Sequence, residues 1–142
     1  SAASDVYKRQ VLANPLLETS KVAPIEIGRS RLVYAFAPWC GVCRMSAANL
    51  NRLTFTGVDV VAVALSYEGR KDVSEFVTST GLAVPVLLAD ARSQEALGVN
   101  AFPTYFLVSS GGSIVKAWSG YTTTLGLMTK VILMPLWQVL AG

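Results

Sequence analysis

Five short apolar runs along the chain predict the strands of a sheet. They are rich in β-branched and aromatic residues, which favour extended structure. The run VDVVAVAL is apolar almost throughout, which is typical of a parallel strand buried on both faces. The predicted strands cover residues 32–36, 58–65, 84–88, 104–108 and 113–118, with 22–27 as a weaker candidate for an edge strand.

Between these runs the apolar residues follow helical spacing. Val73, Phe76, Val77 and Thr80 fall on one face of a helix that Gly81 ends. The predicted helices cover residues 41–53, 73–80, a brief segment that Asp90 or Ser93 caps and Gly98 closes, and a last one from Thr123 or Thr124 to about 134. Each of the first three helices therefore lies between two predicted strands.

The resulting order, βαβαβαββα, predicts an α/β fold with a central mixed sheet. Parallel βαβ units come first, an antiparallel hairpin through the Ser-Ser-Gly-Gly turn at 109–112 follows, and helices cover both faces. No repeat or linker divides the chain, so residues 11–142 are predicted to form a single domain. The first ten residues, SAASDVYKRQ, lack the apolar segment of a signal peptide and resemble translated sequencing-adapter sequence, so we expect 1–10 to be a non-native leader.

The stretch 125–140 is apolar almost all round and admits three interpretations. Lys130, Pro135 and Gln138 interrupt it, and it is shorter than the roughly 20 clean residues that a membrane span needs. The preferred interpretation is a helix packed on the sheet. Contact with a membrane or a partner and a true membrane span are the alternatives.

The amino-acid composition excludes several classes of function for this chain. Hydrophobic residues make up 52% and charged ones 15%, which excludes a disordered chain, and scattered basic residues with a net charge of +3 give no nucleic-acid footprint. The chain has no histidine, which removes hydrolase triads, most zinc and copper sites and haem ligation through His. Its only two cysteines, Cys40 and Cys43, are too few for a four-ligand zinc or iron–sulfur site in one chain, so no metal and no cofactor is predicted.

The chemistry that remains is that of a C-x-x-C dithiol at a predicted strand-to-helix junction. Cys40 is expected at the helix N-terminus, where unpaired backbone N–H groups favour a thiolate, and the three-residue spacing brings Cys43 onto the same face. Arg44 would add to this effect if its side chain turned toward the sulfur. Trp39 would shield the site and offer a flat surface to a partner. An inert structural disulfide and simple packing of two cysteines are the alternatives.

Several motifs together give the chain a resemblance to the thioredoxin-fold family over about residues 30–133. They are LVYAFAPWCGVCR, VDVVAVAL, VPVLLAD, the tripeptide Phe102-Pro103-Thr104 and the hairpin YFLVSSGGSIVKAW. The chain is most similar to the membrane-anchored, extracytoplasmic thioredoxin-like proteins of bacteria, which include cytochrome c maturation reductases and the copper-sensitivity-suppressor D type.

The resemblance implies a role for each matching residue. Cys40 corresponds to the thiol whose thiolate opens a substrate disulfide, and Cys43 corresponds to the resolving thiol that releases the product. Pro103 corresponds to a cis-proline that faces the C-x-x-C motif, and Thr104 belongs with it to the substrate-binding segment. Phe102 is either a residue of the substrate groove or a core aromatic.

Some positions depart from the family pattern. Where thioredoxins of the cytoplasmic type carry a buried Asp, this chain has Tyr34, so that carboxylate is not available for proton transfer at Cys43. Glu68 falls within one residue of a Glu found in some extracytoplasmic relatives, and it is either a general base or a solvated loop charge. Neither Gly41 nor Val42 can stabilise a thiolate as the His of strong oxidants does, which favours a reducing couple.

These observations predict a thiol–disulfide oxidoreductase that reduces disulfides of exported proteins. The resemblance implies protein disulfide substrates, a membrane thiol electron donor, a monomer, and a place on the periplasmic side of a bacterial inner membrane through an anchor upstream of this chain. The alternatives are a disulfide oxidant or isomerase of the same fold, and a module that binds Cu(I) through two thiolates with Met45 as the nearby thioether. Ala37 stands where peroxidases of this fold carry Thr, which disfavours peroxidase activity.

Overall fold

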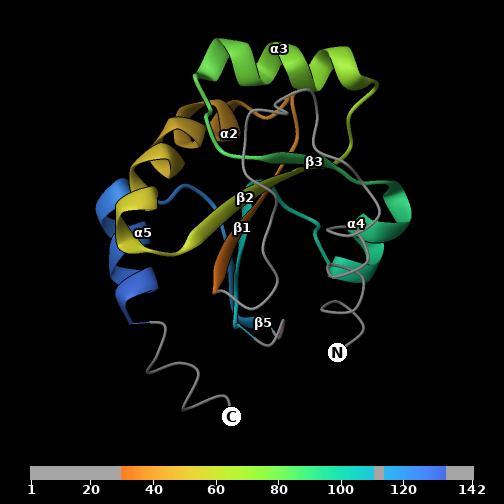
Figure 1. The fold of residues 1–142 in the computed structure, drawn as a ribbon. Coiled ribbons are helices and arrows are strands. Elements are labelled where there is room, and N and C mark those ends of the chain that lie inside the picture. Colours follow the sequence, from red (N-terminus) through yellow and green to blue (C-terminus); the bar gives the residue numbers. More distant parts are fainter. Residues whose placement is uncertain (1–29, 111–113, 134–142) are drawn as a thin grey trace.

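The computed structural model describes residues 30–110 and 114–133, apart from the side chains at 54–56. These residues form a five-stranded sheet with helices packed against it (Figure 1). In chain order the elements are β1 (Arg31–Phe36), α2 (Gly41–Ser46), the 3₁₀-helix η1 (Ala47–Thr56), β2 (Asp59–Ala64), α3 (Arg70–Thr80), β3 (Val86–Leu88), α4 (Ala91–Leu97), β4 (Thr104–Val108), β5 (Ile114–Ser119) and α5 (Thr124–Ile132). This order confirms the predicted alternation of strands and helices.

The sheet is mixed, as predicted, with the strand order β3-β2-β1-β4-β5. The pairs β1–β2 and β2–β3 are parallel, whereas β1–β4 and β4–β5 are antiparallel. The register of the central antiparallel pair sets Ala35, near the end of β1, opposite Thr104 at the start of β4. The segment that follows β1 and the segment that precedes β4 therefore meet at the same edge of the sheet, and these are the C-x-x-C and Phe102-Pro103 segments.

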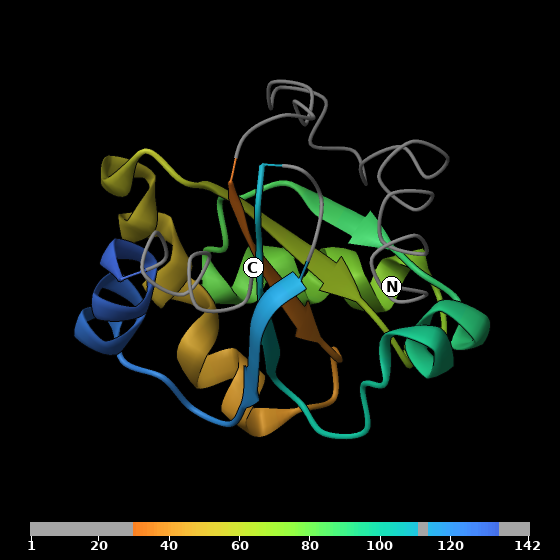
Figure 2. The same ribbon diagram turned by 90° about the horizontal axis from the view of Figure 1, so that it is seen from below.

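Helices cover both faces of the sheet (Figures 1 and 2). Tyr34 and Phe36 of β1 belong to a core that also contains buried residues of α2, η1, α3 and α5. Val33 and Ala35, which alternate with them, belong to a second core that α4 closes. Phe36 stacks on Phe76 of α3 with 4.5 Å between ring centroids. Because β1 is buried on both sides, its sequence is apolar without alternation.

The helix predicted over 41–53 is wrong in its second half. The α-helix ends at Ser46, and the chain continues as the 3₁₀-helix η1. At this point the hydroxyl groups of Tyr34 and Ser46 both donate to the backbone carbonyl of Cys43. Side-chain hydroxyls that compete for a helix carbonyl loosen regular α-helical bonding, which accounts for the change of helix type here.

The strand predicted over 84–88 is shorter in the structure because of Pro85. Proline has no backbone N–H to donate, so β3 begins at Val86, although the Pro85 carbonyl accepts a hydrogen bond from the Ala62 N–H at 2.8 Å. Three predicted features lie wholly or partly outside the described residues: the edge strand 22–27, the turn 109–112 and the end of the apolar stretch 125–140. The leader at 1–10 lies outside them as well.

The structure shows which of the alternative predicted residues cap the two last helices. Asp90 caps α4, and Thr123 caps α5 through a hydrogen bond from the Gly126 N–H. The described part of α5 packs on the sheet through Leu127 and Val131. Over the ranges described above, no helix has the length and apolar content needed to cross a membrane.

Candidate active site

Cys40 caps the N-terminal end of α2, as predicted. Its backbone is extended, and its Sγ accepts a hydrogen bond from the Cys43 N–H at 3.2 Å. The Cys40 thiol also donates to the Phe102 carbonyl, with 3.6 Å between sulfur and oxygen. A backbone N–H directed at a sulfur favours its thiolate form. Cys40 is therefore the thiol of the pair that is suited to nucleophilic attack.

Cys43 lies deeper, with its side chain fully buried, and both cysteines are free thiols. Burial disfavours the Cys43 thiolate and, with a smaller contribution from the hydrogen bond to Cys40, raises the pKa of this thiol to about 12. Cys43 therefore stays protonated near neutral pH. The two thiols of one short motif consequently differ in reactivity.

Tyr34 and Ser46 form a buried hydroxyl pair beside Cys43. The Tyr34 hydroxyl donates to the Cys43 carbonyl at 3.0 Å and lies 2.9 Å from Ser46 Oγ. Burial raises the pKa of Tyr34 well above its ordinary value, so the phenol keeps its proton. The sequence identifies Tyr34 only as a missing carboxylate. Its one signal for Ser46, which was missed, is the three-residue spacing from Cys43 on the same helix.

The Phe102–Pro103 peptide bond is cis, as the family resemblance implies. This segment leads into β4, and the Phe102 carbonyl faces the Cys40 sulfur. Gly120, just after β5, donates its N–H to the Pro103 carbonyl at 2.9 Å. Thr104 Oγ1 donates to the Ala101 carbonyl at 2.6 Å. These two bonds fix the segment on either side of the proline and hold it next to the thiol.

Trp39 and Phe102 form an aromatic wall beside Cys40. The Trp39 side chain is 67% exposed, and its ring meets Phe102 edge-on with 5.6 Å between centroids. Its indole N–H donates to the Ser66 carbonyl at 2.9 Å, so an exposed side chain is nevertheless held in place. Phe102 is half-buried and contacts both cores. It is therefore a core aromatic that also borders the site, and the two interpretations of Phe102 are compatible.

Two apolar side chains of α2 are exposed to solvent. Val42 is 40% exposed and Met45 is 70% exposed, and both lie on α2 close in sequence to Trp39. An added Cβ at Gly41 would meet no atom within 4 Å, so packing does not require glycine there. Among residues 30–110 and 114–133 no group of three or more His, Cys, Asp or Glu side chains could hold a metal ion.

Arg44 does not direct its charge at the sulfur. Its guanidinium donates to Ser79 Oγ at 2.9 Å and lies over the Phe76 ring, 5.4 Å from the centroid. A weaker bond reaches the Pro38 carbonyl at 3.4 Å. Because these partners belong mainly to α3, the cation ties α2 to α3. Arg44 was expected to favour a Cys40 thiolate only if its side chain turned toward the sulfur, and it does not.

Glu68 is exposed to solvent. Its side chain is exposed in the loop after β2, and its backbone N–H donates to Asp72 Oδ2 at 3.1 Å. In the part of the chain that the structure describes, no hydrogen bond joins Glu68 to Cys40 or Cys43. Glu68 is thus an exposed loop residue in the structure, and its role as a general base stays a prediction.

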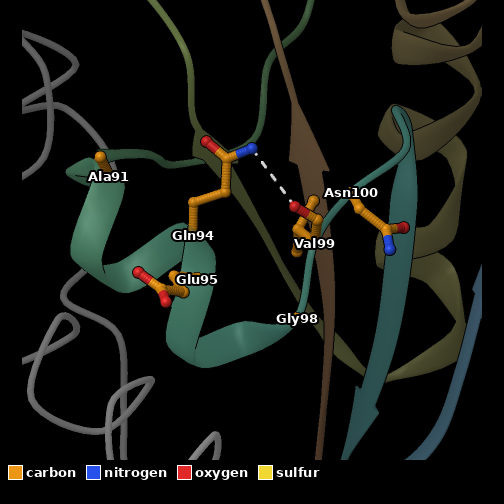
Figure 3. A pocket seen from close by; sticks show the side chains of 6 residues that line it. All are labelled: Ala91, Gln94, Glu95, Gly98, Val99 and Asn100. Atoms are coloured by element: carbon orange, nitrogen blue, oxygen red, sulfur yellow. Dashed lines mark hydrogen bonds between the residues drawn. The ribbon is translucent and has the colours of Figure 1, made fainter.

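A chain of hydrogen bonds leads from Trp39 to a surface pocket beside α4. Ser66, whose carbonyl holds the indole, donates its hydroxyl to Gln94 Oε1 at 2.8 Å. Gln94 donates in turn to the Val99 carbonyl at 3.2 Å (Figure 3). The pocket is lined by Ala91, Gln94, Glu95, Gly98, Val99 and Asn100. The sequence gives no signal for this link, which ties the position of Trp39 to α4.

Comparison with curated proteins agrees with this geometry. Residues 18–130 match the protein family Redoxin. The chain is 26% identical over 115 residues to a thioredoxin-like protein of Haemophilus influenzae, covering 80% of this chain and 68% of that protein. It is 29% identical over 119 residues to the thiol–disulfide oxidoreductase ResA of Bacillus subtilis, covering 78% of this chain and 66% of that protein. The chain thus spans about two thirds of the length of these relatives.

A solved structure extends the comparison to the fold. The chain is similar to a secreted disulfide oxidoreductase of Mycobacterium tuberculosis, homologous to E. coli DsbE, with a TM-score of 0.71 and 17% identity. The superposition covers 88% of this chain and 97% of that one. At this identity the likeness supports the fold, while the family match spans most of the chain. The chain therefore belongs to the Redoxin family and is a thiol–disulfide oxidoreductase with the thioredoxin fold.

Proposed function

We propose that the chain reduces protein disulfides outside the cytoplasm, with Cys40 as the attacking thiol and Cys43 as the resolving thiol. The observation that carries the proposal is the difference between the two cysteines. Cys40 accepts a backbone N–H at the end of α2 and faces the cis Phe102–Pro103 segment. Cys43 is fully buried, and burial raises its pKa to about 12.

The reaction begins at Cys40. Its thiolate attacks one sulfur of a substrate disulfide, forms a mixed disulfide and releases the other substrate sulfur as a thiol. Cys43 then loses its proton and attacks Cys40 Sγ, which releases the second substrate thiol and leaves a Cys40–Cys43 disulfide. Two electrons pass from the protein dithiol to the substrate. A donor thiol must reduce the pair before the next cycle.

In this proposal the substrate binds along Trp39 and the segment from Phe102 through Pro103 to Thr104. The segment borders the reacting atom, because the Phe102 carbonyl lies 3.6 Å from Cys40 Sγ. Trp39 adds an exposed aromatic face that a hydrogen bond to Ser66 holds in position. An extended substrate strand on this surface would bring its disulfide over Cys40.

The direction of electron flow is inferred from what surrounds the Cys40 sulfur. Gly41 and Val42 have no side-chain donor for a thiolate, and the Arg44 guanidinium is bonded to Ser79 on α3. Strong oxidants of this chemistry owe their potential to a stabilised reduced form. A reduced form with one backbone N–H at Cys40 supports a more reducing couple, and so a reductase.

The place of action and the partners are inferred from the relatives. The similar Mycobacterium tuberculosis protein is a secreted disulfide oxidoreductase, which supports a location outside the cytoplasm. We therefore propose that this domain faces the periplasm, that an anchor upstream of it holds it at the inner membrane, and that it works as a monomer. A membrane thiol protein would then supply its electrons, and exported proteins would be its substrates.

The reduction potential of the Cys40–Cys43 pair tests this proposal. The protein is equilibrated with thiol buffers of defined potential, free thiols are trapped by alkylation, and the products are counted by mass spectrometry. We expect a value near that of thioredoxin, about −270 mV. A value near −120 mV would identify an oxidant instead. Cys43→Ser, which cannot form the internal disulfide, is the control for mixed disulfides with the buffer.

A further inference from the structure

The backbone carbonyl of Cys43 has more hydrogen-bond donors than it can use. The Ala47 N–H donates to it within the helix, the Tyr34 hydroxyl donates at 3.0 Å, and the Ser46 hydroxyl donates at 3.3 Å. A carbonyl oxygen has two lone pairs and accepts two good hydrogen bonds. The two hydroxyls, whose oxygens lie 2.9 Å apart, can also bond each other, so one hydroxyl proton of the pair can change its acceptor without leaving the carbonyl unbonded.

The thiol next to that carbonyl has no charged partner. The titratable side chains that face Cys43 are Cys40 at the N-cap of α2, Tyr34 on β1 and Tyr105 on β4. The buried polar side chains of the described residues include no carboxylate. Arg44, on the same helix, is bonded to Ser79. Negative charge that develops on the Cys43 sulfur can therefore be met only by neutral donors, which include a backbone hydrogen bond from Ala37 and the Tyr34 hydroxyl.

We propose that Tyr34 is a positioning residue for the resolving step, with a hydroxyl that turns from the Cys43 carbonyl to the Cys43 sulfur as negative charge develops there, while Ser46 keeps the carbonyl bonded. This inference rests on the proposed function, in which Cys43 resolves the mixed disulfide. It assigns to a neutral phenol the position that a buried carboxylate holds in thioredoxins of the cytoplasmic type.

The step balances without a proton passing through Tyr34. The Cys43–Cys40 bond forms as the bond between Cys40 and the substrate sulfur breaks, and the Cys43 proton leaves with the released substrate thiol. Burial raises the pKa of Tyr34 well above its ordinary value, so it donates a hydrogen bond throughout and does not act as a base. The pKa of Cys43, which burial raises most, is lowered by a backbone hydrogen bond from Ala37 and, to a smaller extent, by the Tyr34 hydroxyl.

Reaction of the reduced protein with one equivalent of 5,5′-dithiobis(2-nitrobenzoate) separates the two steps. Attack by Cys40 releases one coloured thiol, and resolution by Cys43 releases a second, so stopped-flow absorbance records two phases. Tyr34→Phe keeps the ring and removes the donor. We expect it to slow the second phase about tenfold to a hundredfold, the effect of losing a hydrogen bond to a charged group, and to move its pH profile upward. The first phase should change less than about twofold, since Cys40 keeps its own N–H donor.

Tyr105→Phe is the matched control. The Tyr105 ring lies 5.3 Å from the Tyr34 ring, and its buried hydroxyl makes no hydrogen bond of ordinary geometry within the described residues. Both phases should survive this change. Ser46→Ala removes the donor that replaces Tyr34 at the carbonyl, so it should slow the second phase to a smaller extent. The first phase reports a folded site. If Tyr34→Phe loses the first phase, the Ser46→Ala variant is used to test the inference instead.

Three results decide the inference. Equal second-phase rates and pH profiles in Tyr34→Phe, Tyr105→Phe and the unaltered protein would overturn it. So would a second phase that slows in Glu68→Gln and not in Tyr34→Phe, because Glu68 would then serve the resolving step. Release of only one coloured thiol per molecule of the unaltered protein would instead contradict the proposed function, because Cys43 would not resolve.

Discussion

At the scale of single residues, two identical side chains occupy different surroundings within one motif. Cys40 lies at the end of α2 with a backbone N–H directed at its sulfur. Cys43 is enclosed by the core, and the hydroxyls of Tyr34 and Ser46 hold its carbonyl. Burial accordingly raises the pKa of Cys43 to about 12. Because the thiolate is the nucleophile in disulfide exchange, this difference supports the proposed order, in which Cys40 attacks and Cys43 resolves.

The same pKa predicts that Cys43 costs the reduced protein stability at alkaline pH. The thiol ionises near its ordinary value of 9.0 in the unfolded chain and near 12 in the folded protein. A raised folded-state pKa means that the stabilising contribution is complete below about 9 and is lost progressively as the pH rises toward about 12. Urea unfolding of the reduced protein across this range measures the loss.

Cys43→Ala isolates this effect, because the variant has no thiol to ionise at that position. The buried tyrosines Tyr34 and Tyr105 also have raised pKa values and contribute to the alkaline decline in both proteins. The stability of the reduced protein should fall more steeply with pH than that of Cys43→Ala. Parallel declines in the two proteins would contradict the assignment of a raised pKa to Cys43.

At the scale of elements, the short helix α4 supports a position in the active site. Gln94 of α4 accepts from the Ser66 hydroxyl, and the Ser66 carbonyl holds the Trp39 indole. Ser66 adopts a φ of 52°, which is uncommon for a residue with a side chain. A helix of seven residues is marginal by itself, so its caps matter more than in a long helix. Loss of the α4 cap should therefore be felt at Trp39.

Asp90 provides that cap, and its charge makes the cap dependent on pH. Its side chain accepts from the Ser93 N–H at 2.9 Å and from the Ser93 hydroxyl at 2.8 Å. The backbone bond from Ser93 is the main reason that the pKa of Asp90 lies below its ordinary value of 3.8. A lowered folded-state pKa means that the contribution is present above about 3.8 and is lost as the pH falls through the folded value.

We expect Asp90→Ala to lower the urea midpoint at neutral pH and to loosen Trp39, visible as increased quenching of tryptophan fluorescence by acrylamide. Asp90→Asn is the informative partner, because asparagine is a good N-cap that does not titrate. The stability advantage of the unaltered protein over the Asp90→Asn variant should shrink between neutral pH and pH values below about 3.8. An advantage that stays constant with pH would show that the charge of Asp90 is not involved.

The sequence predicts elements and site residues where the determining pattern is local. The apolar run of β1, the end of α3 at Gly81 and the C-x-x-C pair were all identified from neighbouring residues. The change from α2 to η1 was not, because it depends on the Tyr34 hydroxyl, 12 residues before Ser46. The bond from Trp39 to the Ser66 carbonyl spans 27 residues, and no local pattern contains it.

At the scale of the whole molecule, the active site exists only when the sheet is complete. Cys40 follows β1, whereas the Phe102 carbonyl beside it precedes β4, 62 residues away in the chain. The Gly120 N–H that holds the Pro103 carbonyl comes from the end of β5. Disulfide formation between Cys40 and Cys43 therefore takes place in one environment in the folded protein and in another in the unfolded chain. The redox state and the global stability must then be coupled.

This coupling predicts the sign of a stability difference between the two redox forms. Oxidation, reduction, folding and unfolding form a closed thermodynamic cycle, so the oxidised fold is the more stable one whenever the folded couple is more reducing than the unfolded couple. Each 30 mV between those couples corresponds to about 1.4 kcal/mol. The folded reduced form has a protonated, buried Cys43 and one N–H donor at Cys40, so thiolate stabilisation does not favour it strongly. We therefore expect the oxidised protein to unfold at a higher urea concentration than the reduced protein.

The double variant Cys40→Ser/Cys43→Ser should unfold at the same urea concentration under reducing and oxidising conditions, which separates the effect of the disulfide from that of the buffer. If the reduced form were the more stable one, the chain would be an oxidant. This result would hold even if slow equilibration with thiol buffers had given a wrong reduction potential. The two measurements are independent, because one follows thiols and the other follows unfolding. A reductase must satisfy both measurements. By the thermodynamic cycle, a folded couple that is more reducing than the unfolded couple requires the oxidised fold to be the more stable one.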